Sequence, residues 1–293
     1  MAAFERLRNK RGSRGLPQID ASGCFKGGNT MPLQDLRPLA VITGGSSGIG
    51  YYLAKTFLEN GYDILIAAEN AGKLGEAHQA LEALGQGSVD SLEVDLATPE
   101  GVEDLYEAAL DLGAIDVLCC NAGHGEWGKF GDDAELEEEL DLIQLNCAGV
   151  VHLTKLVLDD MLERDRGKIL FTGSVAGATP GPFQAVYHAS KAFVNSFAHG
   201  LRNELKDTGV DVTLLMPGAT DTGFFARAGM EEARVADGRL DDPEVVAQEA
   251  YRALMRGKDQ VITGARNKIM AAGMKTMPES VKAELARKQN EPR

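Results

Sequence analysis

Short apolar runs alternate with amphipathic stretches along the chain from residue 39 onward. Apolar runs of about five residues bounded by turn residues are typical of buried strands, whereas apolar positions three or four apart indicate helices. The predicted strands are residues 39–42, 63–67, 88–94, 115–120, 168–172, 211–216 and 260–263. The predicted helices are residues 52–58, 72–84, 99–112, a long helix through 146 to 163, 183–206 and 243–255.

This alternation predicts an α/β fold: a doubly wound, Rossmann-like parallel sheet of about seven strands with helices on both faces. In such sheets ligands bind beyond the carboxyl ends of the strands. Polar or glycine-containing motifs end several predicted strands: Thr43–Gly50, Asp95, Asn121–Gly123, Ser174 and Pro217–Gly218. We therefore expect these motifs to converge on one binding site.

The glycine-rich stretch Val41–Gly50 joins the first predicted strand to a helix. Gly44 can adopt φ angles that other residues avoid, Gly48 lets a ligand approach the backbone, and Gly50 lets the helix pack close to the strand. Free N–H groups and the dipole at the helix N-terminus favour an anion such as a dinucleotide pyrophosphate. No Gly-Lys-Ser/Thr follows, which excludes a P-loop. A simple tight turn remains the alternative for this stretch alone.

The composition narrows the classes of partner. The chain has 293 residues and a net charge of −14, which argues against nucleic acid or an anionic membrane as a general partner. No uninterrupted apolar run approaches the roughly 18 residues of a membrane span. Cys24, Cys119, Cys120 and Cys147 lack zinc-ligand spacing, and we expect no metal site. The adjacent pair in an apolar strand indicates reduced thiols and a cytoplasmic setting.

The two ends of the chain differ from its middle. Residues 1–36 lack apolar periodicity, and the first 30 hold six basic and two acidic residues. We expect a basic, disordered N-terminal extension, with an organelle transit peptide as the alternative. Residues 37–265 are expected to form the catalytic domain, and residues 266–293 a C-terminal helical tail.

Tyr187 and Lys191 are four residues apart and share one face of a predicted helix. A lysine ammonium near a phenol stabilises the phenolate and lowers the tyrosine pKa from roughly 10. Such a tyrosine can move a proton to or from a substrate oxygen. A surface tyrosine beside a solvated lysine gives the same spacing. The catalytic interpretation of this pair is strengthened by Ser174, thirteen residues before Tyr187 at a strand end, and by the glycine loop.

Together these motifs resemble the short-chain dehydrogenase/reductase family over residues 37 to 265, in its compact single-domain type. Asn146, Ser174, Tyr187 and Lys191 match its catalytic tetrad, while Cys120 departs from the usual Asn before the Asn-Ala-Gly turn. The implied cofactor-binding residues are Thr43, Gly44, Ser46, Ser47, Gly48, Ile49, Gly50, Glu69, Asp95, Leu96, Asn121, Ala122, Gly123, Tyr187, Lys191, Pro217, Gly218, Thr220 and Thr222.

The resemblance implies an oxidoreductase that transfers a hydride between NAD or NADP and a carbonyl compound or secondary alcohol. Tyr187 would be the general acid or base, and Ser174 would hydrogen-bond the same substrate oxygen. Lys191 would hold the nicotinamide ribose and tune Tyr187, while Asn146 would fix a water that relays protons to Lys191. Relatives commonly pair through the helices that bear Asn146 and Tyr187, so we expect a homodimer or homotetramer.

Glu69, just after the second predicted strand, favours NAD over NADP. A carboxylate there accepts hydrogen bonds from the adenosine ribose hydroxyls and repels a 2′-phosphate. NADP-preferring relatives usually place an arginine at this position or a base in the glycine loop, where this chain has Ser46 and Ser47. If Glu69 lies one position further along the chain than the family's acidic residue, its side chain would instead point to solvent.

The segments expected around the substrate hold few charges, which favours a largely apolar carbonyl or alcohol substrate. The expected lining residues are Trp127, Phe130, Pro180, Pro182, Phe183, Phe224 and Phe225. Arg227 is the nearby candidate for binding a substrate carboxylate or phosphate. His124 is a candidate pocket residue, whereas His188 is expected to pack or to face solvent.

Two other functions stay open. A sugar-nucleotide epimerase or dehydratase shares the Tyr-x-x-x-Lys pair, but usually carries a larger substrate domain than the 75 residues after Gly218. A nucleotide-sensing binding protein without turnover would be indicated by loss of Tyr187 or Lys191, and both are present.

Overall fold

The computed structural model describes residues 37–132, 134–230, 232–234, 238, 240–274 and 276–292. The chain divides into two units, Met1–Arg37 and Pro38–Arg293, and the second contains the fold and the site. The expected N-terminal extension, residues 1–36, lies outside the described residues.

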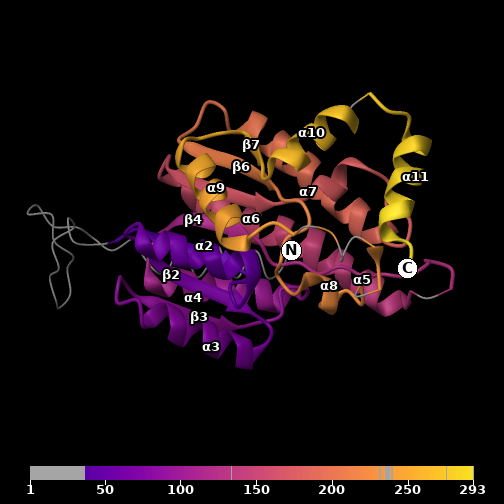
Figure 1. The fold of residues 1–293 in the computed structure, drawn as a ribbon. Coiled ribbons are helices and arrows are strands. Elements are labelled where there is room, and N and C mark those ends of the chain that lie inside the picture. Colours follow the sequence, from indigo (N-terminus) through magenta and orange to yellow (C-terminus); the bar gives the residue numbers. More distant parts are fainter. Residues whose placement is uncertain are drawn as a thin grey trace, which may run out of the picture. The chain divides into compact units, whose positions relative to one another are not determined.

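The centre of the fold is a seven-stranded sheet in which all neighbouring strands are parallel (Figure 1). The spatial order is β3-β2-β1-β4-β5-β6-β7, which confirms the predicted doubly wound sheet. Chain order reverses between β1 and β4, the place where such sheets bind ligands. The strands are β1 (Leu39–Thr43), β2 (Asp63–Ala68), β3 (Val89–Glu93), β4 (Ile115–Cys120), β5 (Gly167–Thr172), β6 (Val210–Met216) and β7 (Gln260–Ile262).

Helices cover both faces of the sheet, which is why the central strands are mainly apolar. All five residues of β1 are buried. Ala40 and Ile42 belong to the core beneath α2, α3 and α9, and Val41 faces the other layer because side chains alternate along a strand. The helices of these two layers are α2 (Gly48–Glu59), α3 (Ala71–Glu82), α9 (Pro243–Met255), α4 (Pro99–Leu112), α6 (Val150–Glu163) and α7 (Ala185–Glu204).

Local sequence fixes where several helices begin. Thr98 caps α4 by accepting a hydrogen bond from the Gly101 amide, and Asp242 caps α9 in the same way from Glu244. A proline follows each cap, where its missing N–H costs nothing. Helix α7 begins at Ala185 rather than at the predicted 183, because Phe183 has φ +66°, outside the helical region.

The long predicted helix starts earlier than expected. Residues 136–163 form one helical stretch made of α5 (Leu136–Ile143), a π-helical turn η2 (Gln144–Gly149) and α6. By length and composition alone this stretch could cross a membrane. The core helix of a soluble protein passes the same test, and α6 packs against β4 and β5 of the sheet. The π turn carries Asn146, and such turns are frequent at functional sites.

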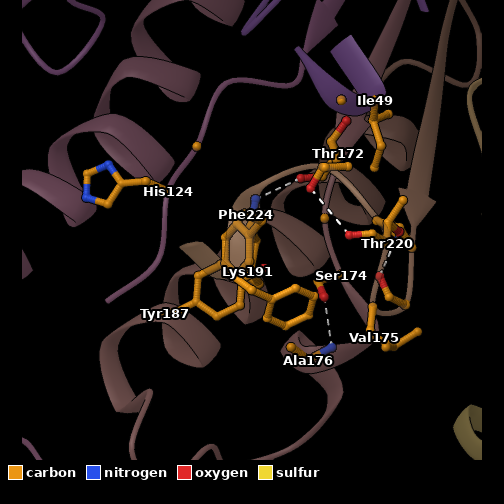
Figure 2. A pocket seen from close by; sticks show the side chains of 18 of the residues that line it. Ile49, His124, Thr172, Ser174, Val175, Ala176, Tyr187, Lys191, Thr220 and Phe224 are labelled. Carbon is orange, nitrogen blue, oxygen red and sulfur yellow. Dashed lines mark hydrogen bonds between the residues drawn. The ribbon is translucent and has the colours of Figure 1, made fainter. Parts of the chain in front are cut away.

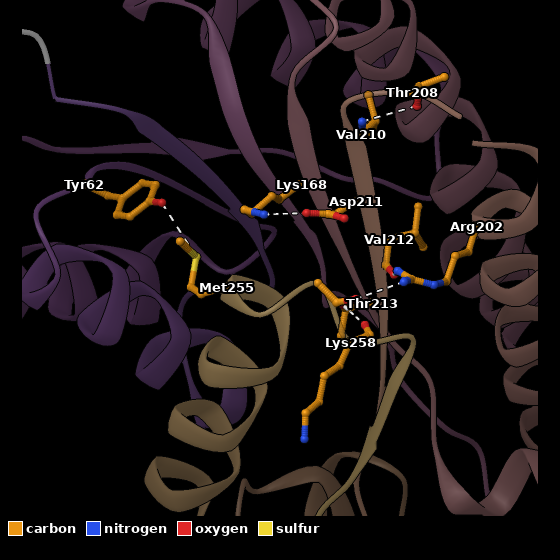
Figure 3. Close-up of polar contacts among 11 residues, drawn as sticks. Tyr62, Lys168, Arg202, Thr208, Val210, Asp211, Val212, Thr213, Met255 and Lys258 are labelled. Carbon is orange, nitrogen blue, oxygen red and sulfur yellow. Dashed lines mark hydrogen bonds and ion pairs between the residues drawn. The ribbon is translucent and has the colours of Figure 1, made fainter. Parts of the chain in front are cut away.

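Polar contacts join β5, β6, α7 and the segment after α9, toward the ends of the strands opposite the glycine loop (Figure 3). The Lys168 ammonium lies 2.6 Å from the Asp211 carboxylate, across neighbouring strands. Arg202 of α7 donates to the carbonyl oxygens of Val212 and Gly257. These contacts leave the carboxyl ends of the strands free to form a site.

Two C-terminal helices, α10 (Ala265–Met274) and α11 (Glu279–Asn290), fold back onto the domain. The Trp127 indole donates to the Asn290 carbonyl oxygen at 2.7 Å, and the Asn290 side chain donates to the Pro182 carbonyl oxygen at 3.1 Å. A bridge between Ala233 and Pro292 and an ion pair between Arg234 and Glu291 reinforce this docking.

Candidate active site

A cavity of about 870 Å³ opens at the carboxyl ends of the strands. Every residue of the expected cofactor site lines it except Thr43 and Gly50, and Ser174 lines it too. Thr43, Gly50 and Asn146 lie behind the lining, and Thr43 and Asn146 are 3% and 1% exposed. The motifs that end the strands therefore converge, as the sequence predicts. Among the described residues, no group of three or more His, Cys, Asp or Glu side chains is placed to hold a metal ion.

The glycine loop lines the cavity between β1 and α2. Gly44 and Gly48 have φ of +66° and +55°, which other residues rarely adopt. A Cβ on Gly50 would lie 2.1 Å from the Gly44 carbonyl oxygen, so only glycine lets the helix start this close to the strand. Ser47 precedes α2 without a side-chain cap, which leaves the first amides of the helix directed at the cavity.

Thr43 and Asn121 hold the ends of three strands together. The Thr43 hydroxyl donates to the Cys119 carbonyl oxygen and accepts from the amides of Asn121 and Ala122. The Asn121 side chain donates to the Thr43 carbonyl oxygen and accepts from the Thr172 hydroxyl. Both residues therefore position the loops, and Asn121 also lines the cavity.

Tyr187, Ser174 and Lys191 meet at one wall of the cavity (Figure 2). Tyr187 and Lys191 come from α7, whereas Ser174 caps the short helix η3 (Val175–Ala178). Burial raises the pKa of Tyr187 to about 12, and a hydrogen bond with Ser174 opposes this rise. The Ser174 oxygen also accepts from the Ala176 amide at 3.0 Å, which fixes its orientation.

Lys191 is 6% exposed, and its ammonium donates to the Thr172 carbonyl oxygen at 3.1 Å. Burial lowers the pKa of Lys191 to about 8. The expectation that Lys191 lowers the pKa of Tyr187 below its ordinary value is wrong for this geometry. The ammonium lies 5.9 Å from the centroid of the tyrosine ring, and removal from water dominates for both groups.

Asn146 clamps the turn that follows β4. Its side-chain amide donates to the His124 carbonyl oxygen at 2.9 Å and to the Ser190 hydroxyl at 3.1 Å. Its oxygen accepts from the His124 amide at 3.2 Å. A Cβ on Gly123 would lie 2.7 Å from this oxygen and 3.4 Å from the Lys191 nitrogen, so the asparagine and the lysine are close neighbours.

The far end of the cavity differs from the expected aromatic pocket. Phe224 and Phe225 line it, and the Phe224 ring lies 5.2 Å from that of Tyr187. Trp127 and Phe183 instead stack on each other beside α11, and Phe130 is 64% exposed outside this cavity. Other residues that line the cavity had no signal in the sequence: the apolar Met230, Met270 and Met274, and the polar Gln184, Arg234 and Lys288.

His124, the candidate pocket residue, lines the cavity, and so does His188, for which no place in the cavity was expected. His188 is buried, its Nδ1 lies 2.9 Å from the Thr179 carbonyl oxygen, and burial lowers its pKa. It packs, as expected, rather than presenting a free imidazole. In Figure 2 the ring of His124 points away from Tyr187 and Ser174.

Arg227, the candidate for binding a substrate carboxylate or phosphate, lines the cavity. It ends the short helix α8 (Phe224–Arg227), and its guanidinium donates to the Ser47 hydroxyl of the glycine loop at 3.5 Å. This contact joins Arg227 to the glycine loop, while Phe224 and Phe225 of the same helix line the cavity beside it.

Comparison with known proteins agrees with this geometry. An oxidoreductase of Staphylococcus epidermidis is 32% identical over 206 residues, which cover 68% of this chain and 87% of that protein. One from Staphylococcus aureus is 30% identical, covering 75% and 92%. Both relatives are named as uncharacterized oxidoreductases.

Solved structures show the same fold with nicotinamide cofactors. A short-chain dehydrogenase from Sphingobium yanoikuyae in complex with NADPH has a TM-score of 0.71 and 28% identity, and covers 82% of this chain and 96% of its own. A relative from Burkholderia phymatum in complex with NAD has a TM-score of 0.75 and 26% identity, covering 88% and 98%. Residues 38–233 match the sequence profile of the short chain dehydrogenases, and the chain therefore belongs to that family of oxidoreductases.

Proposed function

We propose that this protein is an NAD(P)-dependent oxidoreductase that transfers a hydride between a nicotinamide cofactor and a carbonyl compound or secondary alcohol. One observation carries the proposal: Ser174, Tyr187 and Lys191 share a wall of the cavity that the glycine loop also lines. The cofactor supplies the hydride chemistry when bound. The chain supplies binding, orientation and the proton.

The cavity fits a dinucleotide. The open amides of α2 and the close approach allowed by Gly48 suit a pyrophosphate. Glu69 and Asp95 line the end next to β2 and β3, where they would hold the adenosine. Pro217 and Gly218 follow β6 on the side of Tyr187, where they would border the nicotinamide.

Tyr187 is the proposed proton donor in ketone reduction and acceptor in alcohol oxidation. Its raised pKa keeps it protonated at neutral pH, the form that a donor needs. Ser174 hydrogen-bonds the same oxygen, and Lys191 holds the nicotinamide ribose. Asn146, through its contacts with the 121–124 turn, keeps the floor of the site next to Lys191 in place.

The proposed substrate is a largely apolar ketone or alcohol. Phe224, Phe225, Met230, Met270 and Met274 give the cavity apolar side chains, and its lining also holds Arg234, Arg266 and Lys288. A sizeable apolar lining with a few convergent polar groups is typical of sites for small organic ligands.

The test is nicotinamide absorbance on mixing the protein with both cofactors and a panel of ketones and alcohols. Turnover on an apolar ketone is the expected result. Cofactor binding without turnover on any compound would instead favour a nucleotide sensor. In a parallel assay with added sugar nucleotides, an epimer detected by chromatography with no net cofactor change would favour an epimerase.

The pH dependence of ketone reduction follows from the buried lysine. Lys191 loses its charge as pH rises through about 8, whereas Tyr187 stays protonated up to about 12. We therefore expect kcat/KM for the cofactor, which reports the free enzyme, to be level below pH 8 and to fall above it. A profile that stays level to pH 10 would show that the charge on Lys191 is not needed.

An apolar face on α5 and α7 supports self-association. Leu136, Leu140 and Phe193 are 62%, 51% and 43% exposed, and Phe130, Ile143 and Val186 line a shallow apolar groove beside them. We propose a homodimer or homotetramer that buries this face. The buried, reduced Cys119 and Cys120 support a cytoplasmic setting.

Replacing Phe193 with Asp is expected to convert the assembly to monomers, because burying an unpaired charge in an apolar contact costs several kcal/mol. Light scattering after size-exclusion chromatography measures the mass. Val245→Asp, at an exposed apolar position on α9, is the matched control. A wild-type mass equal to one chain would contradict the proposal.

A further inference from the structure

The glycine loop lacks a basic residue in the sequence, yet the fold brings one to it. Arg227 is 180 residues from Ser47 along the chain, and its guanidinium donates to the Ser47 hydroxyl at 3.5 Å. The segment before α8 fixes this approach, because Thr222 lies against the glycine loop. A Cβ on Gly48 would come within 2.7 Å of the Thr222 side chain. The contact between Thr222 and Gly48 therefore places the segment that bears Arg227 beside the glycine loop.

The same guanidinium lies within the electrostatic range of Glu69. The Glu69 charge raises the pKa of Arg227, although burial lowers it more strongly. Both side chains line the cavity, and so does Lys73 at the start of α3. A carboxylate alone at this end would repel a 2′-phosphate, whereas a carboxylate with an arginine beside it can accept either form of the adenosine ribose.

We propose that Arg227 is the 2′-phosphate-binding residue of this protein, so that the chain accepts NADP as well as NAD. With NAD, Glu69 accepts hydrogen bonds from the ribose hydroxyls and Arg227 offsets its charge. With NADP, the guanidinium forms charge-assisted hydrogen bonds with the phosphate, for which its planar fork is well suited. The inference rests on the proposed cofactor site.

The position of Arg227 also links this end of the cavity to the other. Phe224 stands at the opposite end of the same four-residue helix, and its ring lies 5.2 Å from Tyr187. Binding a phosphate through Arg227 therefore holds the helix that forms part of the substrate wall. NADP should support turnover even though Glu69 alone disfavours it.

The test uses two nucleotides that lack the nicotinamide, 2′,5′-ADP and 5′-AMP, titrated into the full chain by calorimetry. Losing hydrogen bonds to a charged group costs about 1.5–3 kcal/mol, or roughly 10- to 150-fold in affinity. Arg227→Met should lower the affinity for 2′,5′-ADP by that factor and the affinity for 5′-AMP by less than about threefold. Arg227→Lys should be intermediate for 2′,5′-ADP, because a point charge replaces the fork.

Two further variants complete the design. Glu69→Gln should have the opposite effect: the affinity for 2′,5′-ADP should rise and the affinity for 5′-AMP should fall. Arg252→Met, which removes one exposed charge from α9, is the matched control and should change neither affinity. Thermal unfolding checks that each variant is folded.

Equal losses for the two nucleotides in Arg227→Met would overturn the inference, because Arg227 would then contact a group that they share. Native protein that binds 5′-AMP but not 2′,5′-ADP would overturn it too. Neither result affects the proposed reaction, which would fail separately if both nucleotides bind as expected and no carbonyl compound or alcohol is turned over.

Discussion

Replacing Tyr187 with Phe is expected to lower turnover by about 10²- to 10⁴-fold, the range for losing a general acid or base. The variant keeps the ring, and with it the contact with Phe224 at 5.2 Å. Folding and cofactor binding should therefore survive. The measurements are steady-state reduction of a substrate found in the ketone panel, fluorescence titration with cofactor and thermal unfolding.

Ser174→Ala tests the role of Ser174 separately from that of Tyr187, the proposed proton donor. It removes the hydroxyl that hydrogen-bonds Tyr187 and, in the proposal, the substrate oxygen. Turnover should fall because a hydrogen bond at the substrate oxygen is lost. Cofactor affinity should change little, because Ser174 is proposed to contact the substrate rather than the cofactor. If Tyr187→Phe folds, binds cofactor and keeps more than about a tenth of the native turnover, the proposed mechanism fails.

The sequence predicted all seven strands to within about two residues, because the central strands, covered on both faces, are mainly apolar. The edge strands β3 and β7 contain no fully buried residue. The expectation that the motifs at the strand ends would meet followed from topology alone. The π turn around Asn146 had no such signal, since an extra residue in one helical turn barely changes the pattern of apolar positions.

The parts that the sequence could not predict depend on burial and on distant contacts. The four-residue spacing of Tyr187 and Lys191 predicted that they share one face of a helix, but it could not predict that both are buried. Burial raises the pKa of Tyr187, whereas the sequence predicted a lowered one. Arg227 reaches Ser47 through a four-residue helix that carries no periodicity. Helix α11 is largely polar, so nothing in its sequence indicated that Asn290 would dock beside the cavity.

Replacing Lys191 with Met is expected to abolish most activity without lowering stability at pH 7. Loss of a charged hydrogen bond to the ribose should weaken cofactor binding roughly 10- to 100-fold. Turnover should fall as well, because the group proposed to hold the nicotinamide ribose beside Tyr187 is lost. Kinetics with each cofactor, cofactor titration and thermal unfolding across pH measure the three effects.

The expectation for stability follows from the direction of the Lys191 pKa shift. The folded protein lowers this pKa from 10.5 to about 8, so the unfolded chain binds more protons between those values. Stability contributed by this group therefore rises with pH through that window, and below pH 8 its buried charge opposes folding by about 3 kcal/mol. Methionine removes that cost but leaves the Thr172 carbonyl oxygen without its donor, which costs about 1–3 kcal/mol.

The two effects nearly offset each other, so the melting temperature of Lys191→Met at pH 7 should not fall. The rise in native stability between pH 8 and 10.5 from this group should be absent from the variant. Arg252→Met, with its exposed charge on α9, should keep both the rise and the activity. A Lys191→Met protein that melts many degrees lower at pH 7 would mean that the lysine stabilises the fold. In that case the buried charge of Lys191 would not lower the stability of the protein in exchange for activity.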